Sequence, residues 1–139
     1  SVEIGKNIKS GIFIFPEAFK LNEKEFEIVI VHENRHCEDV FYGIRIKSES
    51  FETTKLSPKI FNKIFELRAQ ASQLEHIVKS DNAEIRANLK TNSRINFFQQ
   101  YAELLRIRDE EKITEYEKGV VEKHLEYFKE HMKEAIKLK

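Results

Sequence analysis

The five residues His32–His36 have the form H-E-x-x-H, and their types and spacing fit one particular chemistry. On a helix, residues four positions apart lie on the same face, one turn above the other. His32 and His36 could therefore direct two imidazole nitrogens at one zinc ion. Glu33 would stand beside them, where its carboxylate could act as general base toward a zinc-bound water. The motif predicts a metal site if a helix carries it and if a third ligand comes from elsewhere.

A catalytic zinc takes three protein ligands and keeps a fourth position for water. Glu66 is our candidate for the third ligand, because it lies on the next expected helix, beside the apolar stripe of that helix. Asp39 comes three residues after His36 and shares its face. We expect Asp39 to orient a ligand by accepting a hydrogen bond from the second ring nitrogen. Other third ligands stay open on the sequence alone: Asp39 itself, Glu38, Glu75 and His76.

The motif needs a helix, and residues 23–40 are expected to form it. Asn22 and Glu25 have the spacing of a capping box at its start. The aliphatic run Ile28–Val31 predicts that much of its circumference is buried. Because that run is β-branched, a strand stays open for the first half. Residues 41–47 would either continue the helix or form a short strand.

Strands are expected only near the start of the chain. Gly11–Phe15 is short, apolar and aromatic, and it stops at Pro16. That pattern is typical of a strand. Val2–Ile4 has a similar but shorter pattern.

From Ser57 onward the sequence predicts helices. Ser57 and Pro58 form a helix start, with a capping residue followed by proline at the first helical position. Apolar residues then recur every three or four positions, as a buried helical stripe requires: Ile60, Ile64, Leu67, Ala71, Leu74 and Val78.

Three more helices are expected after this one. Asp81 and Glu84 would begin the next helix, and residues 91–93 would separate it from another that ends near Arg108. The last helix would span about 115–138. A capping-box pattern predicts its start, formed by Thr114 and Glu117.

Composition narrows the function classes. Hydrophobic residues make up 40% of the 139 residues and charged residues 35%, which is typical of one globular domain. Lys+Arg and Asp+Glu both number 24, and this balance argues against binding to nucleic acid. No stretch is apolar enough for a membrane span, and no signal peptide is visible. A single cysteine suits a reducing compartment, so a cytoplasmic location is favoured.

Two segments resemble zincin metallopeptidases of the gluzincin type: Val31–Asp39 and Phe65–Ala71. In that family, H-E-x-x-H supplies two histidine ligands, and a glutamate on a following helix supplies the third. Small and polar residues often follow that glutamate, as they follow Glu66 here. The strand at Gly11–Phe15 also resembles the edge strand that lines the substrate cleft. The resemblance covers roughly Ile12 to Gln73.

The resemblance implies a zinc-dependent hydrolase that cleaves peptide bonds in a peptide or protein substrate. Zinc would be bound by His32, His36 and Glu66, with Glu33 as the general base. The implied fold is α+β and predominantly α: a minimal zincin-like domain with a short N-terminal edge strand, an H-E-x-x-H helix and a helical C-terminal half. Residues 1–80 would form the metal-site region, and residues 81–139 a helical subregion packed on the same domain.

Two departures from the family keep other functions open. Zincins usually carry more sheet, with a backing helix ahead of the edge strand. No single residue can be assigned as the donor that stabilises the oxyanion; the candidates are Tyr42, Tyr101, Tyr116 and Tyr127. One alternative is therefore a zinc-binding pseudopeptidase. Another is a non-catalytic helical module, in which helices 93–108 and 115–138 form a hairpin that docks a protein partner or a second copy.

The remaining histidines and the cysteine have simpler interpretations. His124 and His131 lie among Glu and Lys residues on the last helix, so a solvated face is expected there. Cys37 neighbours His36, but adjacent helical positions point about 100° apart. We expect a packed, inert thiol rather than a zinc ligand.

Overall fold

The computed structural model describes residues 23–88 and 93–137, and within these ranges the protein is mostly helical. Its helices are α1 (Glu23–Tyr42), α2 (Pro58–Lys79), α3 (Ala83–Asn88), α4 (Arg94–Glu110) and α5 (Glu115–Lys137). Between α1 and α2 lie β1 (Arg45–Ile46), β2 (Glu49–Ser50) and a 3₁₀ turn at Thr53–Lys55. The predicted class, α+β and predominantly α, is confirmed. The strands expected at Val2–Ile4 and Gly11–Phe15 lie outside the described residues.

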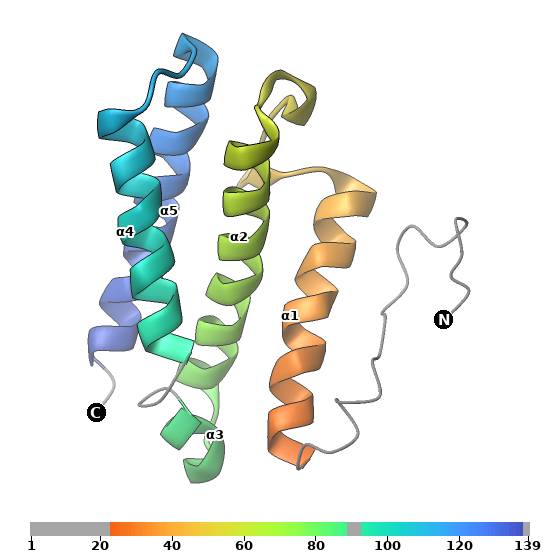
Figure 1. The fold of residues 1–139 in the computed structure, drawn as a ribbon. Helices are drawn as coiled ribbons and strands as arrows, with labels where there is room; N and C mark the ends of the chain where they lie inside the picture. Colours follow the sequence, from red (N-terminus) through yellow and green to blue (C-terminus); the bar gives the residue numbers. More distant parts are fainter. Residues whose placement is uncertain (1–22, 89–92, 138–139) are drawn as a thin grey trace.

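Helix α2 is the centre of the arrangement (Figure 1). It packs against α1 on one side and against α4 and α5 on the other. The two short strands form an antiparallel pair in which Arg45 faces Ser50 and Ile46 faces Glu49. None of the described helices is both long and apolar enough to cross a membrane.

Helix α1 carries the whole H-E-x-x-H motif, as predicted, with His32 at its midpoint and the rest of the motif in its second half. The β-branched run Ile28–Val31 is helical, so the alternative of a strand there is excluded. The helix ends at Tyr42, and Gly43 follows with a φ of 80°. Glycine adopts this left-handed conformation readily, which lets the chain leave the helix and turn into β1. Residues 41–47 therefore contain both the end of the helix and a strand.

One carboxylate links the starts of α2 and α5. The Ser57 hydroxyl accepts a hydrogen bond from the Ile60 N–H at 3.3 Å, as expected of a capping residue. The Ser57 N–H in turn donates to Glu117 Oε2 at 2.7 Å. Glu117 also completes the predicted capping box with Thr114, through bonds of 2.9 and 3.1 Å. Backbone hydrogen bonds from Thr114 and Ser57 hold the pKa of Glu117 below its ordinary value.

The two subregions share one core. The apolar stripe of α2 is buried, except that Ile77 rather than Val78 is the buried residue of its last turn. A single cluster joins residues from both halves of the chain, including Ile28, Ile64, Leu67, Phe97, Leu104 and Phe128. Helices α3, α4 and α5 therefore complete the core that holds α2 in place.

Two details of the helix ends differ from the prediction. The residue that caps α3 is Asn82 rather than Asp81. Its side-chain oxygen accepts hydrogen bonds from the N–H groups of Glu84 at 2.9 Å and Ile85 at 3.1 Å. Helix α4 begins at Arg94 and continues past Arg108 to Glu110.

Candidate metal centre

The structure brings together the three residues that the sequence singled out as zinc ligands. His32 Nε2 lies 2.7 Å from Glu66 Oε1, and His36 Nε2 lies 3.2 Å from Glu66 Oε2. One ligand atom from each residue falls within 4.8 Å of the others. In the described part of the chain this is the only such group of three.

Helix packing accounts for this convergence. His32 and His36 lie one turn apart on the side of α1 that meets α2, and Glu66 reaches them from α2. The two rings are 4.8 Å apart between centroids with their planes at 81°, so they meet edge to face. Their side chains are only 18% and 17% exposed, whereas that of Glu66 is 46% exposed. The ligand atoms are therefore held by partly buried rings and are open to solvent on the carboxylate side.

The two rings are held by different means. The second nitrogen of His32, Nδ1, donates a hydrogen bond to the Gln73 side-chain oxygen at 2.5 Å. His36 instead stacks on Phe65, with centroids 4.2 Å apart and planes at 24°. Its Nδ1 is buried and has no hydrogen-bond partner among the described residues. Sequence reasoning missed Gln73. The available signal was its position seven residues after Glu66, which is two turns along the same helix face.

The charges of the cluster reinforce one another. Burial disfavours the charged form of His32, but its hydrogen bonds to Glu66 and Gln73 outweigh this effect and raise the pKa of the ring. Hydrogen bonds from His32 and His36 hold the pKa of Glu66 well below its ordinary value, against the opposing effect of burial. Glu66 is therefore a carboxylate over the whole physiological range, which is the form that binds a cation.

These residues fit zinc in kind and in number. Two imidazole nitrogens and one carboxylate oxygen form a common three-residue set for catalytic zinc. Nitrogen and oxygen donors in this mixture suit zinc better than magnesium or calcium, which prefer oxygen alone. Because the donors come from two packed helices, the core of the protein holds them in place.

The role expected for Asp39 is wrong. Its two carboxylate oxygens accept hydrogen bonds from Arg68, from Nε at 2.8 Å and from Nη2 at 3.0 Å. Neither histidine of the cluster bonds to it, because His32 uses Gln73 and the Nδ1 of His36 is unpartnered. A buried carboxylate needs strong compensation, and the planar guanidinium provides two parallel bonds. The pairing takes Asp39 away from the histidines.

The solvated face expected for His124 is also wrong. His124 is fully buried on α5. Its Nδ1–H donates to the Val120 carbonyl at 3.0 Å, and its Nε2 accepts from Arg68 Nη1 at 3.3 Å. Burial lowers the pKa of His124 to about 3, so the ring is neutral. The missed signal was periodicity, since His124 falls between Val121 and Phe128 at spacings of three and four.

The other candidates for a third ligand pair elsewhere. Glu38 lies 3.4 Å from Arg35, Glu75 lies 3.5 Å from Lys79, and His76 lies 2.8 Å from Glu27. These pairs lie outside the three-residue cluster, so Glu66 is the third residue that the fold supplies.

Glu33 lies on α1 three residues before His36, a spacing that places it on the side of the helix next to that ring. Its charge is among those that raise the pKa of His32. Cys37 is not part of the cluster. Burial, followed by the charges of Glu33 and Glu38, raises the pKa of its thiol. A raised pKa disfavours the thiolate that would bind a metal.

The tyrosines considered as oxyanion donors have other surroundings. The Tyr116 hydroxyl accepts a hydrogen bond from the Glu52 N–H at 2.6 Å. The Tyr127 ring lies 5.7 Å from the guanidinium of Arg68. Tyr101 packs against the core, and Tyr42 is 67% exposed. Their described contacts therefore do not assign an oxyanion donor.

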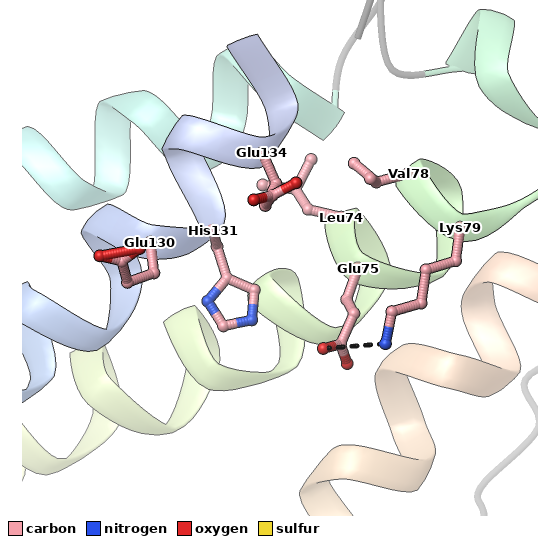
Figure 2. Close-up of a pocket in the computed structure, with 7 residues that line it drawn as sticks. All are labelled: Leu74, Glu75, Val78, Lys79, Glu130, His131 and Glu134. Carbon is pink, nitrogen blue, oxygen red and sulfur yellow. Dashed lines mark ion pairs between the residues drawn. The ribbon is translucent and has the colours of Figure 1, made fainter. Parts of the chain in front are cut away.

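A separate hollow of about 250 Å³ lies between the C-terminal turns of α2 and α5 (Figure 2). Its lining is partly apolar and partly acidic: Leu74, Glu75, Val78, Lys79, Glu130, His131 and Glu134. None of the three clustered ligands lines it. This hollow is therefore not the space in front of the candidate metal centre.

Comparison with protein-family models, with curated proteins and with solved structures finds no match to this chain. The function must therefore be inferred from the residues and their geometry.

Proposed function

We propose that this protein is a zinc-dependent hydrolase of peptide bonds, similar in its site to the gluzincins. His32, His36 and Glu66 would bind zinc, and Glu33 would act as general base. One observation carries the proposal: both Nε2 atoms lie within 3.2 Å of the Glu66 carboxylate, and one ligand atom from each of the three residues falls within 4.8 Å of the others. The H-E-x-x-H spacing alone gives two ligands. The fold adds a third of the right chemistry on a partly open face.

The division of labour follows from the positions of the residues. When bound, zinc lowers the pKa of a coordinated water toward neutrality and polarises the substrate carbonyl. Glu33, beside His36, takes a proton from the attacking water as its oxygen bonds to the carbonyl carbon. Glu33 then gives that proton to the amide nitrogen as the C–N bond breaks. The products are a carboxylic acid and an amine, so atoms and charges balance.

The alternative of a helical docking module has less support. The apolar residues that would form its surface on α4 and α5 already pack in the core. Phe97, Leu104, Val121 and Phe128 are fully buried, and Phe98, Tyr101 and Leu105 pack against them. Because the apolar face of this hairpin already packs on α2, few apolar residues remain exposed to bind a partner.

The decisive experiment compares zinc-loaded native protein with Glu33→Gln on a mixture of unstructured peptides, with cleavage followed by mass spectrometry. We expect the variant to keep its zinc and to lose cleavage by at least about 100-fold, as removal of a general base does. Glu38→Gln is the matched control, because it removes an exposed carboxylate of the same helix and should cleave like the native protein.

Equal cleavage by native protein and Glu33→Gln would contradict the assignment of the base. If the native protein binds zinc but cleaves none of the peptides, the hydrolase is contradicted, and the zinc-binding pseudopeptidase replaces it.

A further inference from the structure

We infer that Gln73 is a positioning residue for the metal centre: it accepts a hydrogen bond from His32 Nδ1 and so holds the ring with Nε2 directed at the place where the ion would bind. The inference rests on the proposed function for its consequence, but the contact itself lies in the structure. Gln73 Oε1 is 2.5 Å from His32 Nδ1, and the residues belong to α2 and α1.

The chemistry of the amide decides what this contact does. The oxygen of a glutamine side chain only accepts hydrogen bonds, so the ring nitrogen that faces it must carry hydrogen. Without an ion, Nε2 lies 2.7 Å from Glu66 and donates its hydrogen to that carboxylate. On metal binding Nε2 would give up this hydrogen, whereas Nδ1 would keep its hydrogen and its bond to Gln73.

The spacing along α2 makes the fixation two-sided. Gln73 follows Glu66 by seven residues, so both side chains leave the same face of the helix two turns apart. Gln73 contacts one ring nitrogen of His32, and Glu66 contacts the other. The orientation of the ring is thereby fixed from both sides by a single helix.

His36 has no equivalent support among the described residues. Its Nδ1 lacks a hydrogen-bond partner, and its ring is placed by the stack on Phe65. Stacking fixes the plane of a ring but does not select its tautomer. Of the two histidines, His32 is therefore the one whose ring is oriented by a hydrogen bond to Nδ1, and Gln73 provides that bond.

The first test measures zinc affinity by competition with a chromophoric chelator. Gln73→Leu removes the acceptor at similar volume and should weaken zinc binding by about tenfold to a hundredfold, the usual effect of losing such a partner. Gln73→Glu keeps an acceptor oxygen and should restore binding to the native level or better. Gln70→Leu is the matched control: it removes an amide one turn from Glu66 whose oxygen has no described hydrogen-bond partner, and it should change the affinity little.

The second test does not depend on metal. ¹H–¹⁵N spectra of metal-free protein report the Nδ1–H group of His32 directly. We expect a hydrogen-bonded Nδ1–H that exchanges slowly with water in native protein and in Gln70→Leu, and fast exchange in Gln73→Leu.

Native-like affinity in Gln73→Leu, or equally slow exchange of the His32 Nδ1–H in that variant, would overturn the inference. Failure of native protein to bind zinc would instead overturn the proposed function. In that case the spectra alone judge whether Gln73 controls His32.

Discussion

Glu66 and Arg68 lie two residues apart on α2, yet their side chains enter clusters of opposite character. Glu66 meets His32 and His36 on an open face, with 46% of its side chain exposed. Arg68 meets Asp39 and His124 inside the protein, where the Arg68 and Asp39 side chains are 3% and 2% exposed. Each cluster combines histidine with a carboxylate. The closed cluster adds an arginine and is buried, whereas the open cluster has a second histidine and is partly exposed.

The members of the closed cluster bond to one another. Both oxygens of Asp39 bond to Arg68, and both ring nitrogens of His124 have partners. These buried bonds tie α1, α2 and α5 together. In the open cluster the His36 Nδ1 has no described partner, and Glu66 faces solvent. The difference teaches that exposure to solvent separates a structural cluster of histidine and carboxylate from one that can bind a ligand.

Breaking the closed cluster should have the largest effect on stability. Arg68→Met leaves the buried Asp39 carboxylate without a partner, and we expect a loss of about 3–5 kcal/mol in the free energy of unfolding. Urea denaturation measures it. Lys79→Met is the control, since it removes an exposed ion pair with Glu75 and should cost at most about 1 kcal/mol. Equal losses in the two variants would contradict the structural role of Arg68.

Breaking the open cluster should change stability little and zinc binding strongly. Glu66→Gln should change the unfolding free energy of metal-free protein by less than about 1 kcal/mol, because solvent screens a carboxylate that is 46% exposed. The same change should sharply reduce zinc affinity, because it removes the charged ligand. A stability loss as large as that of Arg68→Met would make Glu66 structural and erase the contrast between the clusters.

A subtler effect should appear in the pH dependence of stability. The pKa of His124 falls from an ordinary 6.5 to about 3 on folding. Between these values the unfolded state binds one more proton than the folded state. The free energy of unfolding therefore rises with pH and falls as the solution is acidified. His124→Gln removes this titration and keeps an acceptor for Arg68, so its stability should vary less across the same window.

The comparison of the two pH profiles isolates His124, because the carboxylates are common to both proteins. Parallel profiles of the native protein and His124→Gln would mean that His124 is not held neutral in the fold.

The open cluster could largely be predicted from the sequence, and the closed one could not. H-E-x-x-H on a helix is a local pattern, and Glu66 lies near the apolar stripe of the next helix. Local sequence patterns were therefore enough to predict all three residues of the cluster. Asp39 was misjudged because helical spacing gives its face but not its partner. Arg68 competes for it from α2, and that contact depends on how two helices pack.

The remaining differences have similar causes. His124 was assigned to solvent from its charged neighbours, although the stripe through Val121 and Phe128 passes through it. Gln73 was missed because an amide carries no charge and no motif. Its role depends on an atom of His32 that only the packed structure places within reach.

The most direct test of the central claim is the zinc content of three proteins after equilibration with zinc and removal of the excess. We predict about one zinc per chain in native protein and in His124→Gln, and none in the double variant His32→Ala/His36→Ala. That result would place the metal at the open cluster and exclude the closed one. Full zinc retention by the double variant, or a lack of zinc in all three folded proteins, would contradict the account.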